Sequence, residues 1–102
     1  MRIFTRTTVV RYCERYPQAR SGLEYWHKLA KKARWACLLE VREDFPHADP
    51  VIVASGNPVV VFNIAGNKYR LIAAIHYNTQ RLFVLTVLTH AEYDKENWKD
   101  TL

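Results

Sequence analysis

The sequence predicts an α+β fold in which N-terminal helices pack on one face of a small, mainly antiparallel β-sheet, followed by a short C-terminal helix. Apolar residues in the first half recur at spacings of three and four, which is typical of amphipathic helices. The second half contains β-branched apolar runs separated by polar turns, which indicate strands. The chain has 102 residues, of which 49% are hydrophobic, and we expect one globular domain spanning residues 1–102.

The first half is expected to open with a short strand at residues 2–5. A helix is predicted next, because three apolar residues have helical spacing: Val9, Val10 and Cys13. Pro17 ends this helix. The clearest helix follows, since one apolar stripe is formed by Ala19, Leu23, Trp26, Ala30 and Ala33. Residues 35–45 then predict one or two further helical turns that end at Pro46.

The second half begins with a connection at residues 47–58, which includes a short extended piece at residues 51–54. An antiparallel meander is then predicted, with strands at residues 59–64, 68–77 and 81–89. Tight turns join these strands, and Gly66 provides unusual backbone dihedrals in the first turn. Residues 90–99 are expected to form a helix that the hydroxyl of Thr89 caps.

The charge of the chain favours a polyanionic partner. Lys and Arg number 15 against 10 Asp and Glu, which gives a formal net charge of +5. Nucleic acid is the first candidate, with a membrane surface or an acidic protein as alternatives, and a charge that merely keeps a small protein in solution also stays open. Because the sequence has no apolar run of about 18 residues and no N-terminal secretory signal, we expect a cytoplasmic protein that does not enter a membrane.

The cysteines and histidines do not predict a metal or cofactor site. Cys13 and Cys37 are isolated, without C-x-x-C spacing, and we expect them to be buried thiols rather than a disulfide. The histidines are scattered through the chain at His27, His47, His76 and His90. We therefore expect neither a metal ion nor a cofactor.

Alternation along the middle strand of the meander sorts its side chains onto two faces. Lys68 and Arg70 share one face. The other face carries the apolar set that should meet the helices: Tyr69, Leu71 and Ala73. Two cations at the start of a central strand indicate an anionic ligand, and phosphate fits, because Arg offers a planar fork and Lys a point charge. The alternative is that Arg70 pairs with a carboxylate and Lys68 is solvated at the turn.

A second polar cluster lies at residues 89–94. Since the last hairpin turns near residues 78–80, His90 should return opposite Lys68, and a helical turn would set Tyr93 on the same side as His90. A Lys, an Arg, a His and a Tyr together suit phosphodiester cleavage. A general base takes the proton of a ribose 2′-OH, cations stabilise the developing charge, and a general acid protonates the leaving oxygen, without a metal ion. The alternative is that His90 caps the helix and Tyr93 packs in the core.

Two motifs resemble the HigB branch of the RelE-like toxins. Residues 61–72 read Val-Phe-Asn-Ile-Ala-Gly-Asn-Lys-Tyr-Arg-Leu-Ile, which is similar to a core motif vFNIxGNxYRLI of HigB-type toxins. Residues 89–94, Thr-His-Ala-Glu-Tyr-Asp, resemble the THxEYD ending of the same toxins. The helix break at residues 15–18 and the late aromatic Trp98 extend the resemblance over most of the chain.

The resemblance implies a RelE-like fold and a toxin of a type II toxin–antitoxin system. Such toxins cut mRNA on the translating ribosome by attack of the 2′-OH, without a metal, and a helix-turn-helix antitoxin of the HigA type neutralises them. By position, Arg70 corresponds to an arginine that contacts the scissile phosphate. His90 falls where relatives place a basic catalytic residue, and Tyr93 resembles a tyrosine that stacks on or activates the substrate nucleotide. Lys68 would supply cationic roles that RelE gives to lysines of the preceding strand.

The predicted catalytic residues are therefore Lys68, Arg70, His90 and Tyr93. The general base stays unassigned among them, because the preceding strand lacks the lysines of RelE. The predicted substrate-binding residues are Asn63, Asn67 and Asp94. Two other functions remain open: a non-catalytic RNA- or ribosome-binding module, and a protein-interaction domain whose basic sheet face docks an acidic partner.

Overall fold

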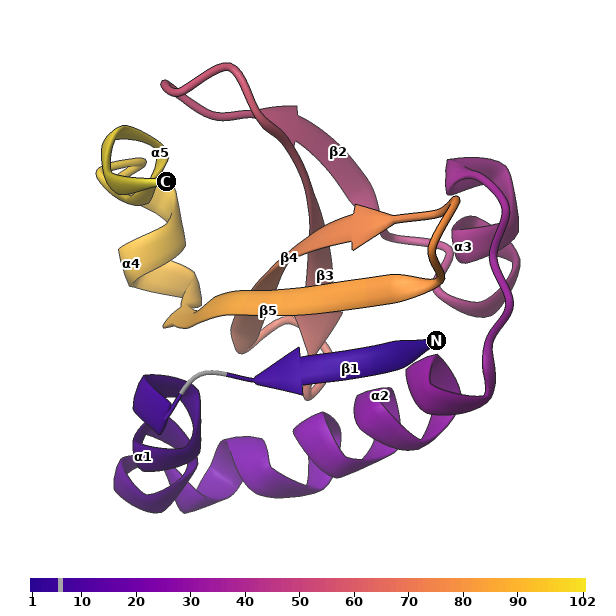
Figure 1. Ribbon diagram of the computed structural model, residues 1–102. Helices are drawn as coiled ribbons and strands as arrows, with labels where there is room; N and C mark the ends of the chain where they lie inside the picture. Colours follow the sequence, from indigo (N-terminus) through magenta and orange to yellow (C-terminus); the bar gives the residue numbers. More distant parts are fainter. Residues whose placement is uncertain (6) are drawn as a thin grey trace.

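A five-stranded sheet forms the centre of the molecule (Figure 1). The computed structural model describes residues 1–5 and 7–102. The strands lie in the order β1-β5-β4-β3-β2, with bounds β1 Arg2–Thr5, β2 Asp49–Ile52, β3 Pro58–Ile64, β4 Tyr69–His76 and β5 Arg81–Thr89. β1 runs parallel to β5, and the other neighbouring strands pair antiparallel. The α+β class and the predicted meander, which is β3-β4-β5, are confirmed.

Helices lie on both faces of this sheet. Their bounds are α1 Thr7–Arg15, α2 Arg20–Lys32, α3 Leu38–Asp44, α4 His90–Asp94 and α5 Trp98–Thr101, with a 3-10 turn at Pro17–Ala19 between α1 and α2. The predicted stop before Pro17 and the predicted third helical segment are both confirmed.

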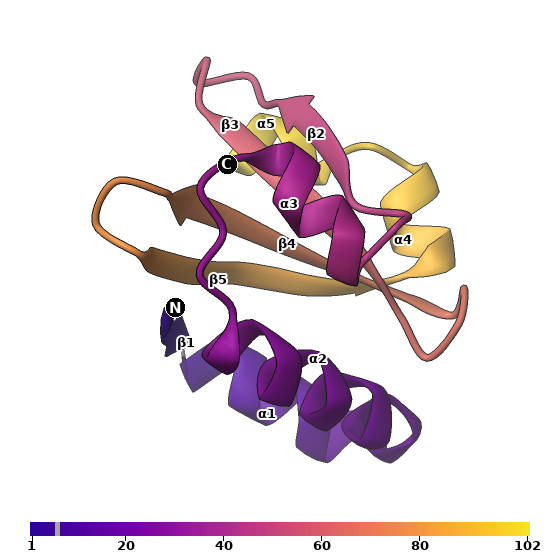
Figure 2. The ribbon, with the colours of Figure 1, turned by 90° about the vertical axis from the view of Figure 1, so that its right-hand side faces the viewer.

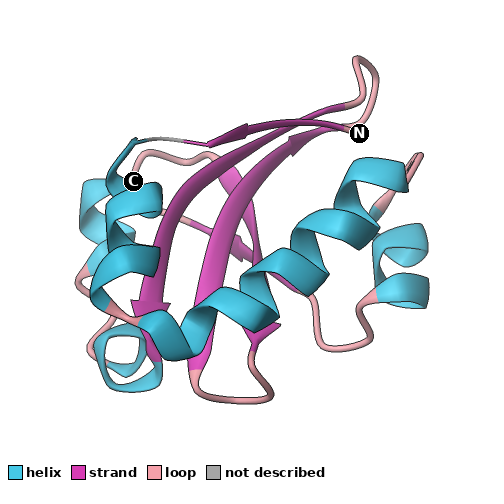
Figure 3. Ribbon diagram, turned by 90° about the horizontal axis from the view of Figure 1, so that it is seen from below, coloured by secondary structure: helices cyan, strands magenta, loops and turns pink. Residues whose placement is uncertain are grey.

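The main core lies between the sheet and the helices α1 and α2, which cross one sheet face in Figure 3. Phe62 of β3 is fully buried there, and Trp26 of α2 packs against it edge-on, with ring centroids 5.4 Å apart. Burial of large apolar side chains of this kind stabilises a fold by roughly 1.5–3 kcal/mol each. Tyr69, Leu71 and Ala73 belong to the same core. The predicted face of β4 therefore meets the helices.

A smaller apolar cluster lies on the opposite sheet face, where the C-terminal segment packs: Val53, Val59, Val61, Ile72 and Trp98. Ser55 Oγ donates a 2.7 Å hydrogen bond to the carbonyl oxygen of Leu102. The amide of Ala54 donates a 2.9 Å hydrogen bond to the carbonyl oxygen of Lys99. These bonds tie α5 to the β2–β3 connection. The C-terminal segment thus stands on the sheet face that also carries Arg70.

The predicted short C-terminal helix is confirmed, but it does not extend over residues 90–99, because the chain breaks between α4 and α5. Glu96 has a φ of +61°, in the left-handed region, which ends the helical path. The break allows Trp98 to fold back and donate a 3.1 Å hydrogen bond from Nε1 to the carbonyl of Tyr93. The predicted cap is confirmed: Thr89 Oγ1 accepts from the amide of Glu92 at 3.2 Å, and Glu92 Oε1 accepts from the amide of Thr89 at 3.0 Å.

Three local predictions differ from the structure. The extended piece expected at residues 51–54 is strand β2, which begins two residues earlier because it pairs with β3. Lys68 lies in the turn before β4 rather than in the strand. The predicted burial of Cys37 is wrong, since its side chain is exposed; Cys13 is half-buried, and both thiols are free.

The turn between β3 and β4 lies against α2 at Gly22. A Cβ at this position would stand 2.7 Å from the amide nitrogen of Ala65 and 2.9 Å from Cγ2 of Ile64, so glycine is required for the approach. Ala65 and Gly66 have φ values of +53° and +71°, which confirms the unusual dihedrals predicted for Gly66. Helix α2 therefore supports the turn that leads directly to Arg70.

Candidate functional site

A polar cleft of about 400 Å³ opens on the sheet face that carries the C-terminal segment. Its lining combines three parts of the chain: α3 with the following connection, the sheet, and α4. The lining residues are Arg42, Pro46, His47, Ala48, Asp49, Val61, Asn63, Arg70 and Tyr93. Helices α3 and α4 can be followed in Figure 2. The volume is within the range of about 300–1,000 Å³ that is typical of small-molecule sites.

Arg70 is the buried cation of this cleft, with a side chain only 8% exposed. Its Nη1 donates to the carbonyl oxygens of Asn67 at 3.1 Å and Tyr69 at 3.2 Å, and its Nη2 donates to Asn67 Oδ1 at 2.6 Å. All three acceptors are neutral, and no carboxylate of residues 1–5 and 7–102 forms an ion pair with Arg70. The predicted alternative, a paired arginine, therefore does not hold among these residues. A buried guanidinium without a counter-charge favours an anionic ligand.

Tyr93 forms the wall of the cleft over Arg70. The Cζ atom of Arg70 lies 5.4 Å from the centroid of the Tyr93 ring, which is a cation–π contact. Tyr93 also stacks on Trp98, with centroids 5.3 Å apart and an interplanar angle of 19°. Lys99 Nζ lies 5.7 Å from the ring centroid of Trp98. The four side chains form one column, which holds the Tyr93 ring at the cleft.

The phenol of Tyr93 is neutral at physiological pH. Burial raises its pKa above the ordinary value, and the carboxylate of Asp49 raises it further, whereas Lys99 and Arg70 partly offset these effects. A protonated phenol can donate a hydrogen bond or a proton to an oxyanion. The arrangement therefore provides a donor beside the Arg70 cation.

Asn63 and Asn67 reach Arg70 in different ways. Asn63 of β3 is directly opposite Arg70 in the sheet register and lines the cleft. Asn67 belongs to the β3–β4 turn, and its side chain and carbonyl both fix the guanidinium. Of the three residues predicted to bind substrate, Asn63 lies in the cleft, Asn67 orients its cation, and Asp94 does not line the cleft.

Lys68 and His90 form a second pair at the edge of the sheet where β4 begins and β5 ends. The amide of His90 donates a 2.9 Å hydrogen bond to the carbonyl of Lys68, which confirms that residue 90 returns opposite residue 68. Both side chains are exposed, and neither lines the cleft. His90 Nε2 lies 3.4 Å from Asp94 Oδ2. The structure thus brings the predicted site residues together as two pairs, Arg70 with Tyr93 and Lys68 with His90.

Three polar residues of the cleft were not predicted as site residues from the sequence: Arg42, His47 and Asp49. They come from α3, the α3–β2 connection and the start of β2, and neither their types nor their spacing matches a known site motif. Arg42 is held by a 3.0 Å hydrogen bond from Nε to the carbonyl of Ala48. Only the register of β2 beside β3 places this part of the chain next to Arg70.

Comparison with known proteins decides the family. The model of the HigB toxin family, described as the RelE-like toxic component of a toxin–antitoxin system, matches residues 19–96. The chain belongs to the HigB toxin family. Membership implies an antitoxin partner, and the five-stranded sheet with its flanking helices is consistent with a RelE-like fold.

Relatives of this HigB-family chain carry names that state an activity. A protein of Escherichia coli O6:H1 named mRNA interferase HigB is 30% identical over 95 residues, which cover 93% of this chain and 90% of the relative. A protein of Shigella flexneri with the same name is 27% identical over 94 residues, which cover 92% and 88%. The similarity includes the segments that form the cleft, since the family match runs from the start of α2 to beyond α4.

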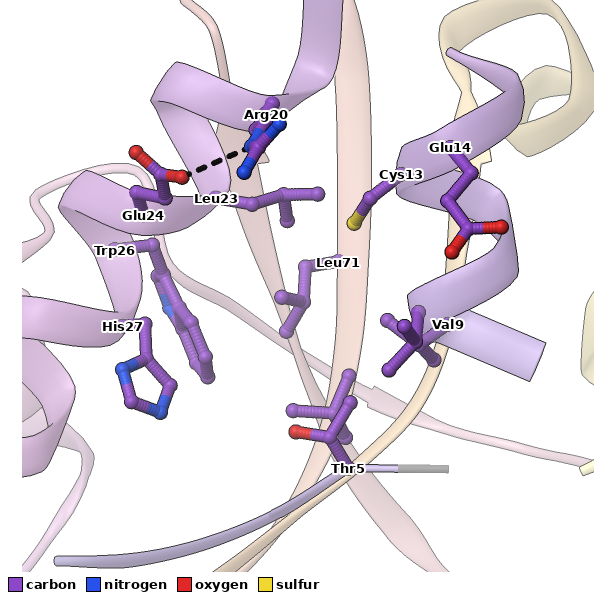
Figure 4. A pocket seen from close by; sticks show the side chains of 12 residues that line it. Thr5, Val9, Cys13, Glu14, Arg20, Leu23, Glu24, Trp26, His27 and Leu71 are labelled. Carbon is purple, nitrogen blue, oxygen red and sulfur yellow. Dashed lines mark hydrogen bonds and ion pairs between the residues drawn. The ribbon is translucent and has the colours of Figure 1, made fainter. Parts of the chain in front are cut away.

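A second hollow, of about 500 Å³, lies on the opposite face of the HigB-family fold, between α1 and α2 (Figure 4). Its floor and walls are mainly apolar, with Leu23, Trp26 and Leu71 among the lining side chains. Arg20 and Glu24 form a 3.1 Å ion pair at its rim. None of the predicted site residues lines it.

Two further features bear on the class of protein. Within the described ranges, no group of three or more His, Cys, Asp or Glu side chains is arranged to hold a metal ion. No helix in the described part of the chain is long and apolar enough to cross a membrane.

Proposed function

We propose that this chain is an endoribonuclease that cleaves mRNA on the translating ribosome and thereby inhibits translation. The observation that carries the proposal is the Arg70–Tyr93 pair: a buried guanidinium with neutral acceptors lies under an aromatic ring at an open cleft. Phosphate fits the guanidinium, and a nucleobase or ribose fits the ring. The family and the names of the relatives supply the reaction class.

The proposed reaction is attack of a ribose 2′-OH on the adjacent phosphorus. A general base takes the 2′-OH proton as the new P–O bond gives a 2′,3′-cyclic phosphate, and the bond to the 5′ oxygen of the next nucleotide breaks as a general acid protonates that oxygen. Arg70 stabilises the negative charge of the phosphorane. Tyr93 positions the nucleotide and donates to the phosphate or the leaving oxygen, which its protonated phenol permits. This route needs no metal ion.

Lys68 and His90 are proposed to complete the site from the adjacent sheet end, with His90 as the proton-transfer group and Lys68 as an additional cation. Their backbone hydrogen bond keeps them together, and their exposure leaves them accessible to an RNA that extends out of the cleft. Asn63 and Asp94 are proposed as substrate contacts, and Asn67 acts by orienting Arg70.

The proposed partner is a helix-turn-helix antitoxin of the HigA type, and the proposed location is the cytoplasm, where ribosomes translate mRNA. The family supports an antitoxin in general. The net charge of +5 supports a substrate or ribosomal surface that is polyanionic.

The test is controlled expression followed by mapping of mRNA 5′ ends by primer extension. The parent chain should arrest growth and create discrete new 5′ ends, whereas Arg70→Ala should do neither. Arg15→Ala is the matched control, because Arg15 is an exposed arginine in the last turn of α1 and does not line the cleft. Binding to ribosomes without new 5′ ends would instead indicate a non-catalytic RNA-binding module.

A further inference from the structure

Arg42 is a second arginine of the cleft that the proposed reaction does not use. It lies in the last turn of α3, and its Nε donates a 3.0 Å hydrogen bond to the carbonyl of Ala48. This bond fixes the direction of the guanidinium. Its two Nη groups make no hydrogen bond with any described residue, and none of the described carboxylates forms an ion pair with it. Four N–H donors of Arg42 are therefore free for a ligand.

The neighbouring acids do not neutralise Arg42. Asp44 Oδ2 accepts a 2.8 Å hydrogen bond from Trp35 Nε1, so this carboxylate is directed to the core side of α3. Asp49 is the one carboxylate among the cleft-lining residues, against the charges of Arg42 and Arg70. The charge of the cleft is thus positive, and two guanidinium groups from different elements lie in one hollow of about 400 Å³. Such a pair is favourable when an anion lies between or beside them.

Resting on the proposed function, we infer that Arg42 binds a second phosphate of the RNA, next to the one that Arg70 contacts. The cleft then takes a segment of single-stranded RNA with two consecutive phosphates, one at each arginine. The nucleotide between them faces Asn63 and the Tyr93 ring, which lie in the same cleft. The hydrogen bond to Ala48 plays for Arg42 the orienting part that Asn67 plays for Arg70.

An arginine in the last turn of a helix also interacts favourably with the helix dipole, so a purely structural role must be separated from ligand binding. Arg15 offers the comparison, because it occupies the last turn of α1 and lies outside the cleft. A structural role predicts a loss of stability in Arg42→Gln, through the helix dipole and the bond to Ala48, and no effect on RNA. A phosphate-binding role predicts an effect on RNA affinity from Arg42→Gln alone.

The experiment compares three ligands with three full-length proteins: the parent, Arg42→Gln and Arg15→Gln. The first ligand is a dinucleotide with one internal phosphate, and the other two are the same dinucleotide with a phosphate added at the 5′ end or at the 3′ end. A 2′-deoxy sugar before the internal phosphate prevents cleavage. Affinities are measured by NMR titration, which follows the Nε–H signals of Arg42 and Arg70 directly.

In the parent chain, the added phosphate at one of the two ends should improve affinity by about tenfold, as expected for a hydrogen bond between charged groups. Arg42→Gln should abolish this gain and leave the affinity for the first ligand unchanged. Arg15→Gln should keep the gain. The dependence of affinity on salt should also become shallower in Arg42→Gln, by a slope of about 0.7 for one lost contact with a single strand.

An equal gain in Arg42→Gln and in the parent would show that Arg42 binds no phosphate, and the proposed nuclease function would stand without it. If none of the three ligands bound the parent chain, the cleft would not be an RNA site, and both proposals would be wrong. A third outcome is that Arg42→Gln abolishes the gain from the added phosphate but the parent chain leaves mRNA intact. This outcome would support phosphate binding by Arg42 and overturn the nuclease function.

Discussion

Asn67 Oδ1 accepts a 2.6 Å hydrogen bond from Nη2 of Arg70, so the turn that ends β3 also sets the direction of the first cation of β4. The carbonyl of Asn67 accepts a second bond from Nη1 of the same side chain at 3.1 Å. Three residues of sequence separation are enough for this contact because the turn is tight. The guanidinium is therefore oriented before any ligand arrives, which is the arrangement expected of a preorganised anion site.

Substitution of Asn67 tests this relationship. In Asn67→Ala the guanidinium loses its side-chain acceptor, and we expect mRNA cleavage to fall by about tenfold or more, the equivalent of one hydrogen bond to a charged group. The measurement is the cleavage rate in a reconstituted translation reaction. Asn78→Ala is the control, because Asn78 is an exposed asparagine in the opposite hairpin turn. An unchanged rate in Asn67→Ala would mean that the orientation of Arg70 does not matter.

Replacement of His90 separates chemistry from stability. His90 and Asp94 are 48% and 61% exposed, so the contact between them contributes less than about 1 kcal/mol. His90→Gln should keep the urea midpoint of the parent and lower cleavage by about 100-fold or more, the usual effect of losing a proton-transfer group. Asp94→Asn should also keep the midpoint. Normal cleavage by a folded His90→Gln would assign the proton transfer to another group.

The stability of the chain should depend on pH in the alkaline range through Tyr93. Its pKa is raised in the folded chain, so the folded state holds the phenolic proton more tightly than the unfolded state. This contribution is complete below the ordinary tyrosine pKa of about 10 and is lost as the pH rises through the folded pKa. The free energy of unfolding should therefore fall above about pH 10, and less steeply in Tyr93→Phe.

Urea titrations from about pH 8 to about pH 11 measure the free energy of unfolding of the parent and of Tyr93→Phe. Tyr12 and Tyr77 also have raised pKa values, chiefly through burial, so part of the decline should persist in Tyr93→Phe. Tyr25→Phe, at a side chain that is 65% exposed, is the control. Parallel curves for Tyr93→Phe and the parent would contradict the burial of the Tyr93 phenol.

Gly22 allows α2 to pack closely against the β3–β4 turn that leads to Arg70, and its substitution tests this contact. In Gly22→Ala the new methyl group would meet the amide of Ala65 at 2.7 Å, and backbone cannot move aside as a flexible side chain can. We expect a loss of about 1–3 kcal/mol in the free energy of unfolding, as for overpacking. Ser21→Ala, at an exposed position of the same helix, should have little effect. Equal stability of both variants would show that the turn relaxes freely.

Local patterns of the sequence predicted the part of the site that one hairpin builds. Alternation along β4 placed Arg70 opposite the helix-covered face, and the length of the last hairpin brought His90 back to Lys68. Both inferences depend only on the period of a strand and the position of a turn. The capping box at Thr89 was readable for the same reason, since it involves residues three apart.

The remaining wall of the cleft depends on contacts between distant segments. Arg42 and Asp49 reach Arg70 only because β2 adds to the edge of β3, and no periodicity in the sequence specifies that neighbour. The column of Tyr93 and Trp98 depends on the left-handed backbone of Glu96, an unusual conformation for a residue other than glycine. The sequence therefore predicted Arg70 and its neighbours Asn63, Asn67 and Tyr93, whereas the opposite wall of Arg42, His47 and Asp49 became visible only in the structure.

The most direct test of the central claim is cleavage of mRNA in a reconstituted translation reaction with purified protein. The parent chain should generate discrete 5′ ends on a translated message, and Arg70→Gln should reduce their yield by about 100-fold or more, as expected for loss of the main charge-stabilising donor. Arg15→Gln should cleave like the parent. Cleavage by a folded Arg70→Gln at the parental rate would contradict the assignment of this cleft as the nuclease site.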